Sequence, residues 1–349
     1  KRGKQLLEEN LTILKKFNNE NHIRISQILL YLGLINWDLG NFEKAKDFYE
    51  QSLIVSKKHL PENPSGVART LASLGHVLRQ LGHYEKAQDA LEQSLLICKK
   101  YCPENHLRVA VVLSYLGFVH YEVARYEKAI NHLERSLTIY KKYYPENYYG
   151  IARALVILGM SYSKLGNYKK AKDILEQSLI NHLNYYPKNH YSTFWVLGQL
   201  GNVHTRLGHY EKARGLLKQC LVTFEKYYGI NQDVTARVLL DLGETYLAEG
   251  NIEVAENLMK KSLKIFQQNK HPLSYASLES LAELYLKKSR KNVNVQETSN
   301  FKTKARDYLK QALEVVKIHF PEDSPHITRI QRKLNELELH DALKRPHLH

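Results

Sequence analysis

The chain has 349 residues and is poor in the features that mark several classes of protein. Its three cysteines, Cys98, Cys102 and Cys220, are too few and too irregularly spaced for a disulfide framework, which favours a reducing compartment. A zinc site normally needs four ligands, so two nearby thiols without further partners do not predict one. No apolar run reaches the ~18 residues that would span a membrane, and no signal peptide is visible.

Sequence motifs of catalysis are also missing. There is no Gly-x-Ser-x-Gly elbow, no His-Glu-x-x-His pair and no phosphate-binding loop. The 17 histidines are scattered, and no nucleophile, base and orienting group can be assembled from the pattern. We therefore expect no enzyme, no catalytic residue, no cofactor and no metal in this chain.

What the sequence does contain is one pattern repeated many times. A Leu-Gly pair recurs at a constant spacing of 42 residues, with its glycine at Gly33, Gly75, Gly117, Gly159, Gly201 and Gly243. Twelve residues after each glycine stands an alanine, usually preceded by an aromatic residue three positions earlier. From each alanine, apolar residues tend to recur at i, i+4 and i+8, which predicts an amphipathic helix with one buried face.

Each repeat is interpreted as two helices joined by a tight turn. Glycine stands at this turn in five copies, where a backbone with positive φ is favoured. A proline follows the second helix in most copies and cannot continue it. Because one helix pair cannot bury its own apolar face, stacked pairs are expected to share a continuous core.

The segment LGHVLRQLGHYEKAQDALEQSL, which begins at Leu74, resembles the tetratricopeptide repeat. Its Leu-Gly pair, the Gly-x-Tyr of the turn and the alanine of the second helix match the marker positions of that family. The 42-residue period, with its lengthened second helix, is similar to the long repeats of kinesin light chain. The resemblance implies an all-α fold, a right-handed superhelical solenoid of antiparallel helix pairs, whose first helices line a concave binding groove.

The register of the pattern predicts a single array over residues 1–349. Residues 1–22 correspond to a second helix alone, and residues 23–274 hold six repeats. Residues 275–324 form a degenerate seventh repeat with a polar insertion at residues 289–300, interpreted as a mobile loop. Residues 325–349 are expected to form a capping helix and a tail. Since the chain begins at Lys1, we expect it to be a piece of a longer protein.

Positions that vary between copies, beside positions that are nearly copied, are candidates for binding. Such positions lie six and two residues before each repeated glycine and four residues after it. The predicted groove residues are Tyr31, Trp37, Arg69, Arg79, Tyr115, Tyr121, Arg153, Lys164, Trp195, Arg206 and Arg237. The arginines would pair with carboxylates, and the aromatic residues would anchor apolar side chains. The alternative is neutral variation on a solvated surface, with some aromatic residues packed between helices.

A second candidate surface follows the ends of the second helices. The net charge is +15, and lysine pairs recur at one repeat position, as Lys57, Lys58, Lys99, Lys100, Lys141 and Lys142. Such a basic stripe could bind nucleic acid or an anionic surface. Lysines at a helix C-terminus also complement the helix dipole, so the pairs have a local explanation as well. We keep this as the alternative function, with nucleic acid less favoured than a protein partner.

The sequence therefore predicts a protein–protein interaction module that binds an acidic or aromatic-containing peptide or protein in the groove. Nearly copied repeats rich in Lys, Asn, Ile and Tyr suggest recent duplication in an AT-rich genome. They motivate the hypothesis of a larger effector or adaptor protein of an intracellular bacterium. We expect a cytoplasmic location, or the host cytosol if the protein is exported. Self-association stays open, and the sequence does not identify the partner.

Overall fold

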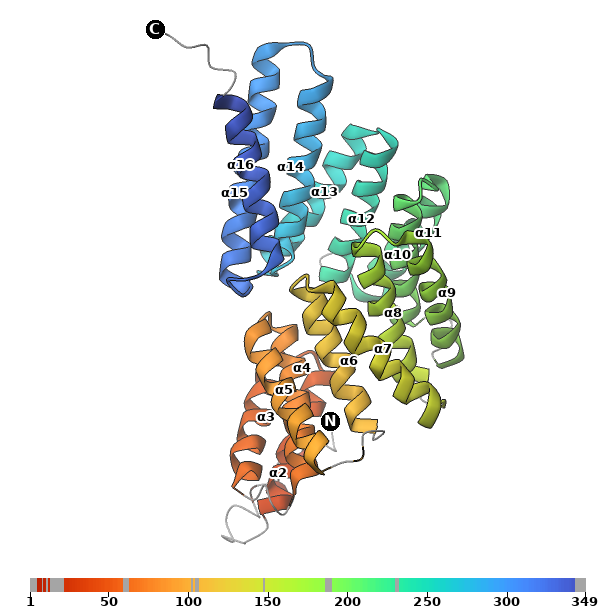
Figure 1. Cartoon of the computed structure of the whole chain (residues 1–349), viewed down its shortest axis with the longest axis vertical. Coiled ribbons are helices and arrows are strands. Elements are labelled where there is room, and N and C mark those ends of the chain that lie inside the picture. Colours follow the sequence, from red (N-terminus) through yellow and green to blue (C-terminus); the bar gives the residue numbers. More distant parts are fainter. Residues whose placement is uncertain are drawn as a thin grey trace. The chain divides into compact units, whose positions relative to one another are not determined.

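The computed structural model describes residues 5–7, 9, 10, 12, 22–58, 63–101, 103, 107–146, 148–185, 190–229 and 232–342. The described residues form helices and contain no strand (Figure 1). The helices are, in chain order, α2 His22–Asp38, α3 Phe42–Lys57, α4 Pro64–Gln80, α5 Tyr84–Tyr101, α6 Leu107–Glu122, α7 Tyr126–Tyr143, α8 Tyr148–Lys164, α9 Tyr168–Tyr185, α10 Tyr191–Arg206, α11 Tyr210–Tyr228, α12 Asp233–Glu249, α13 Ile252–Gln268, α14 Ser274–Lys291, α15 Val295–His319 and α16 Pro325–Ala342. Most of the predicted partial repeat at residues 1–22 lies outside the described residues.

The helices pack as successive pairs in two compact units. The first unit holds residues 1–122 and 127–150, and the second holds residues 123–126 and 151–349. In the first unit α2 packs on α3 and α4 on α5; in the second, α10 packs on α11, α12 on α13 and α14 on α15. The predicted all-α class and its helix pairs are therefore confirmed, while the single array over the whole chain stays a prediction.

One buried hydrogen bond recurs between the two helices of a pair. The Oγ atoms of Ser52, Ser94 and Ser136 each donate to a first-helix carbonyl 26 residues earlier, at 2.7 Å. In α11 the same place is taken by Cys220, whose Sγ donates to the Phe194 carbonyl at 3.0 Å. Burial raises the pKa of this thiol to about 12, so Cys220 is a packing residue and not a reactive thiolate.

The glycine of each Leu-Gly pair lies directly under the second helix. A Cβ atom on Gly75 would stand 2.5 Å from Leu91 Cγ, and one on Gly117 would stand 2.5 Å from Leu133 Cγ. Such contacts are closer than real Cβ atoms allow, so a side chain here would push the helices apart. The repeated alanine, for example Ala87, is fully buried in the same contact zone.

The polar insertion is helical, so the expected loop at residues 289–300 was wrong. Helix α14 continues to Lys291, and α15 begins at Val295. The Asn294 side chain caps α15 by accepting from the backbone N–H groups of Gln296 and Glu297 at 2.9 and 3.2 Å. This N-cap satisfies donors that would otherwise be free, and it lets the inserted residues lengthen a helical hairpin.

The turn between α6 and α7 has no glycine at the position where five other repeats have one. Gly82 holds φ at +80° in the turn between α4 and α5, whereas Ala124 occupies the corresponding place with φ at +61°. A positive φ brings the Cβ of a non-glycine residue close to its own backbone, and this conformation is costly.

We expect Ala124→Gly to raise the free energy of unfolding by about 0.5–1 kcal/mol, because relief of backbone strain exceeds the added entropy of the unfolded chain. Urea unfolding followed by circular dichroism measures the change. Gly82→Ala is the matched control and should lower stability by about 1 kcal/mol. Equal stability of wild type and Ala124→Gly would show that this turn carries no strain.

Candidate functional site

All eleven predicted groove residues lie on the first helices of the pairs. In the first unit these are α2, α4 and α6, and from Arg153 onward they are α8, α10 and α12. The structure groups some of these side chains and separates others. The two units form different surfaces.

An aromatic stack crosses the first helices of the first unit. The ring of His76 on α4 lies between Trp37 of α2 and Tyr115 of α6, with both centroid distances at 4.3 Å. The His76 and Tyr115 rings are nearly parallel, at 5°, and His76 is only 8% exposed. We call these three residues the aromatic ladder. It joins two predicted groove residues through a histidine that the sequence analysis did not select.

The two predicted arginines of this unit differ in their surroundings. Arg69 lies over the ring of Tyr31, 5.5 Å from its centroid, and the Tyr31 side chain is exposed. Arg79 pairs with Glu122 at 3.4 Å, and both side chains are largely buried. Its guanidinium also lies over the Phe118 ring, so Arg79 is already engaged within the protein.

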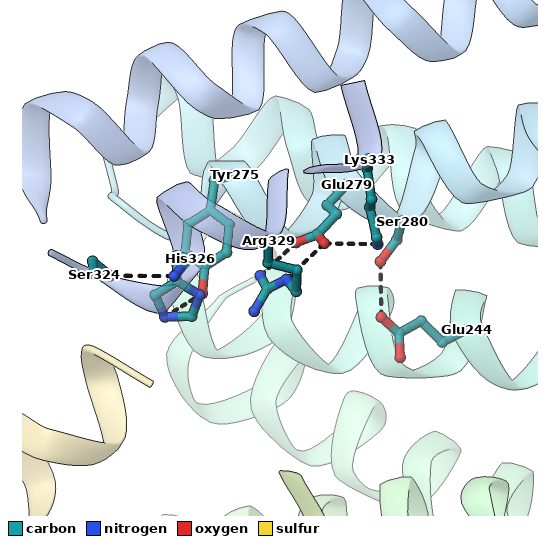
Figure 2. Close-up of polar contacts among 8 residues, drawn as sticks. All are labelled: Glu244, Tyr275, Glu279, Ser280, Ser324, His326, Arg329 and Lys333. Atoms are coloured by element: carbon teal, nitrogen blue, oxygen red, sulfur yellow. Dashed lines mark hydrogen bonds and ion pairs between the residues drawn. The ribbon is translucent and has the colours of Figure 1, made fainter. Parts of the chain in front are cut away.

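The first helices α10 and α12 of the second unit are joined by hydrogen bonds and ion pairs. Asn202 of α10 donates to Asp241 of α12 at 3.0 Å, and Arg206 pairs with Glu244 at 2.8 Å. Ser280 of α14 donates to the other oxygen of Glu244 at 2.8 Å (Figure 2). We call these five residues the charge ladder.

A second polar cluster holds α16 against α14. Arg329 donates to both oxygens of Glu279, from Nε at 2.9 Å and from Nη2 at 2.7 Å. Lys333, one turn further along α16, donates to Glu279 at 2.8 Å, and Figure 2 shows all three side chains converging. Burial alone would raise the pKa of Glu279, but the hydrogen bonds and charges of Arg329 and Lys333 lower it to about 2.

Asp241 is an unusual carboxyl within the charge ladder. Burial, together with the nearby charge of Glu244, raises its pKa to about 7. Arg237, the hydrogen bond from Asn202 and the charge of Lys164 act in the opposite direction but do not outweigh burial. A carboxyl with such a pKa changes its charge near neutral pH.

A cavity of about 720 Å³ opens beside the charge ladder in the second unit. Its apolar lining includes Leu247, Leu286 and Leu309, from α12, α14 and α15. Charged side chains of both signs surround this lining. Within the described residues, two of them, Glu283 and Arg290 of α14, have neither an ion pair nor a hydrogen bond. An apolar surface with charged groups at its edge suits an amphipathic ligand.

The remaining predicted residues have mixed placements. Trp195 is partly buried and packs against the core cluster that contains Phe194 and Leu217, which fits the packing interpretation. Arg237 and Lys164 lie close enough to Asp241 to lower its pKa, so both border the charge ladder. Tyr121 and Arg153 are half-buried on α6 and α8.

The sequence analysis missed one informative repeat position. The residue directly after each Leu-Gly glycine is Leu34, His76, Phe118, Met160, Asn202 or Glu244. It supplies the centre of the aromatic ladder and two members of the charge ladder. The same comparison between copies could have found it, because this position varies as strongly as those that were selected.

The six lysines of the predicted basic stripe are exposed at the ends of α3, α5 and α7. Within the described part of the chain, none of the six forms an ion pair. Across the same residues, no group of three or more His, Cys, Asp or Glu side chains could hold a metal ion. No described helix is long and apolar enough to cross a bilayer.

The repeated helix pairs define a helical-repeat protein. Family models for the tetratricopeptide repeat match residues 26–59, 66–142, 108–181, 150–223 and 192–268, which together make up more than half of the chain. The chain belongs to the tetratricopeptide repeat family, as the sequence predicted. Folds of this family are typically non-catalytic scaffolds for binding other proteins. No curated protein sequence matches the chain significantly.

Two solved structures share the fold at low sequence identity, and a third is similar over part of the chain. The apo form of the quorum sensor NprR from B. thuringiensis is 13% identical, with 95% of this chain and 92% of that chain covered and a TM-score of 0.61. A Rap protein complexed with competence and sporulation factor is 15% identical, covers 98% and 100% and has a TM-score of 0.55. The nearly identical repeats of a putative kinesin light chain from Podosopora anserina are 21% identical, cover 60% and 98% and have a TM-score of 0.45.

We expect Asp241→Asn to make the protein more stable than wild type at about pH 8, by at least about 1 kcal/mol. The folded state keeps the Asp241 proton up to about pH 7, whereas the unfolded chain releases it near 3.8. The free energy of unfolding of the wild type therefore falls as pH rises from 3.8 to about 7. The Asp241→Asn variant has a neutral amide that does not titrate, so its stability does not fall in this range. Urea unfolding at several pH values tests this. Parallel pH profiles would show that Asp241 is already ionised in the fold.

We expect Glu279→Gln to loosen α16 and to lower its local stability by about 2 kcal/mol, because Arg329 and Lys333 lose their shared carboxylate. Hydrogen exchange of the amides around Ile330 and Leu334, both buried, reports the change. The control is Glu336→Gln, whose exposed partner Arg332 is 3.8 Å away, and it should have almost no effect. Equal exchange in the two variants would contradict a stabilising role for Glu279.

Proposed function

We propose that the chain binds a peptide or an extended segment of a partner protein on its first-helix face, with the cavity of the second unit as the principal site. The observation that carries this is the cavity itself, about 720 Å³ with an apolar lining and charges of both signs at its edge. Peptides are recognised by such surfaces through apolar anchors in pockets and a few placed polar groups. Binding, and not catalysis, is the activity we assign to this surface.

The paired arginines change the expected chemistry of the partner. The sequence analysis predicted an acidic or aromatic-containing ligand, but Arg79, Arg206 and Arg329 are each paired with a carboxylate of the chain itself. A ligand carboxylate that binds one of these three arginines would have to displace its present partner. We therefore propose a ligand with an apolar side chain for the cavity and polar groups of both signs beside it.

The fold comparison supports this proposal in general terms. A Rap protein of the same fold is known in complex with competence and sporulation factor, and NprR is a quorum sensor. The proposed cellular role is that of an adaptor in the cytoplasm, within a larger effector or adaptor protein of an intracellular bacterium. The aromatic ladder of the first unit, built on Trp37, His76 and Tyr115, would offer a separate apolar contact.

We expect the double variant Glu283→Lys and Arg290→Glu to weaken peptide binding by about tenfold or more, because it inverts both unpaired charges at the cavity. Peptides are first selected from a displayed random library against the purified wild-type chain, and affinities are then measured by fluorescence polarisation. The control is Lys310→Glu with Glu314→Lys, which swaps two exposed charges on α15 outside the cavity lining.

Two results would overturn the proposal. One is failure to select any peptide with measurable affinity for the folded chain. The other is a set of selected peptides that bind the cavity variant and the control variant equally well. Circular dichroism establishes that both variants keep the helical content of the wild type, so that lost binding cannot be attributed to unfolding.

A further inference from the structure

A separate surface lies at the ends of the second helices of the first unit. We define the basic edge as the six lysines at residues 57, 58, 99, 100, 141 and 142 together with Ile54, Leu96, Tyr101 and Tyr143. Ile54 and Leu96 are large aliphatic side chains that are 64% and 70% exposed. Tyr101 and Tyr143 are 45% and 43% exposed.

The helix period places the aliphatic and basic residues on the same face. Ile54 precedes Lys57 and Lys58 by three and four residues, and Leu96 stands in the same relation to Lys99 and Lys100. Residues three or four apart are neighbours on a helix surface. Each exposed aliphatic side chain therefore lies beside two ammonium groups.

The equivalent hydrogen bonds of Ser52, Ser94 and Ser136 show that α3, α5 and α7 sit in the same way on their first helices. Their last turns therefore recur along one edge of the first unit. The tyrosines belong to this arrangement, since Lys100 lies over Tyr101 and Lys142 over Tyr143, at 5.2 and 5.0 Å from the ring centroids.

Exposed acidic residues also lie near this edge. Glu50, Glu92 and Glu134 are exposed about two turns before the lysine pairs on the same helices. Glu146 is exposed just beyond α7. Among the described residues none of these carboxylates forms an ion pair with the six lysines, which leaves the ammonium groups available to a partner.

The second unit supplies an internal comparison. Ile180 and Val222 occupy the repeat position of Ile54 and Leu96 and are exposed to a similar extent, 60% and 65%. However, the lysine pair is replaced there by Leu183 and Asn184, and by Glu225 and Lys226. Among the described residues at this repeat position, an exposed aliphatic side chain stands three and four residues before a lysine pair in the first unit but not in the second.

We propose that the basic edge docks on the surface of an anionic lipid membrane. Lysine ammonium groups are attracted to anionic headgroups, and aliphatic side chains beside them can enter the boundary between headgroups and acyl chains. Tyrosine suits the same interface because its ring is apolar and its hydroxyl is polar. The contact is peripheral and uses α3, α5 and α7 of the first unit, whereas the proposed peptide site is the cavity that α12, α14 and α15 line in the second unit.

Nucleic acid is the competing partner for a row of lysines, and the aliphatic residues argue against it. A phosphate backbone gives no partner to Ile54 or Leu96, which would stay exposed to water. Single-stranded nucleic acid also needs open aromatic faces for base stacking. Here a lysine of the chain itself covers one face of both Tyr101 and Tyr143.

The test is flotation of the full chain with vesicles of phosphatidylcholine and phosphatidylserine at a ratio of about 70 to 30, against vesicles of phosphatidylcholine alone. We expect wild type to bind the anionic vesicles and not the neutral ones. Replacing Lys57, Lys58, Lys99 and Lys100 by Gln should weaken binding by about 100-fold. Ile54→Ser with Leu96→Ser should weaken it by about tenfold. The matched control, Ile180→Ser with Val222→Ser, should bind as wild type does.

A fluorescent single-stranded oligonucleotide is titrated with the same four proteins at two salt concentrations. Equal vesicle binding by wild type and the lysine variant, or no vesicle binding by wild type, would overturn the proposal. Oligonucleotide binding that needs the lysines but not Ile54 and Leu96, without vesicle binding, would identify a nucleic-acid surface instead. All substituted positions are exposed, and circular dichroism confirms that the variants stay folded.

Discussion

The close contact between the two helices of each repeat is the constraint on which the rest of the structure depends. A Cβ atom on Gly75 would collide with Leu91, and three residues beyond Leu91 the buried Ser94 hydroxyl donates to the carbonyl of Ala68. The glycine sets the distance between the helices, and the hydrogen bond sets their register. Once both are set, each position relative to the glycine points in a known direction, either into the core or onto one of the surfaces.

The surface residues can differ between repeats because the fold depends on the repeated glycine, alanine and serine positions. At the position directly after the repeated glycine, the His76 ring contacts the rings of Trp37 and Tyr115. At the same position in other repeats, Asn202 and Glu244 form hydrogen bonds with polar side chains of neighbouring helices. The same backbone position thus builds an aromatic ladder in the first unit and a charge ladder in the second. Changes at this position can therefore give different contacts while the scaffold positions stay the same.

The helices, the turns and the first-helix location of the variable residues could be predicted, because each depends on a pattern within one repeat. The partners of Arg79 and Arg206 could not, since Glu122 and Glu244 lie 43 and 38 residues further along the chain. Such pairs depend on how far one helix pair is shifted along the next. A comparison of equivalent positions in the sequence gives no information on that shift. The insertion at residues 289–300 was misjudged because its polar composition suggested a loop, while Asn294 caps a helix there.

The chain uses its charges in two different ways. On the first helices several ionic groups are paired within the chain, as Arg206 is with Glu244 and Glu279 with Arg329 of α16, so these pairs contribute little long-range attraction. A ligand there must offer a better arrangement than the existing pairs, which favours specificity over simple charge attraction. The lysines at the ends of α3, α5 and α7 are unpaired among the described residues, and their summed field extends into solvent. Paired charges select a ligand by shape and chemistry, whereas unpaired charges beside exposed Ile54 and Leu96 suit an extended anionic surface.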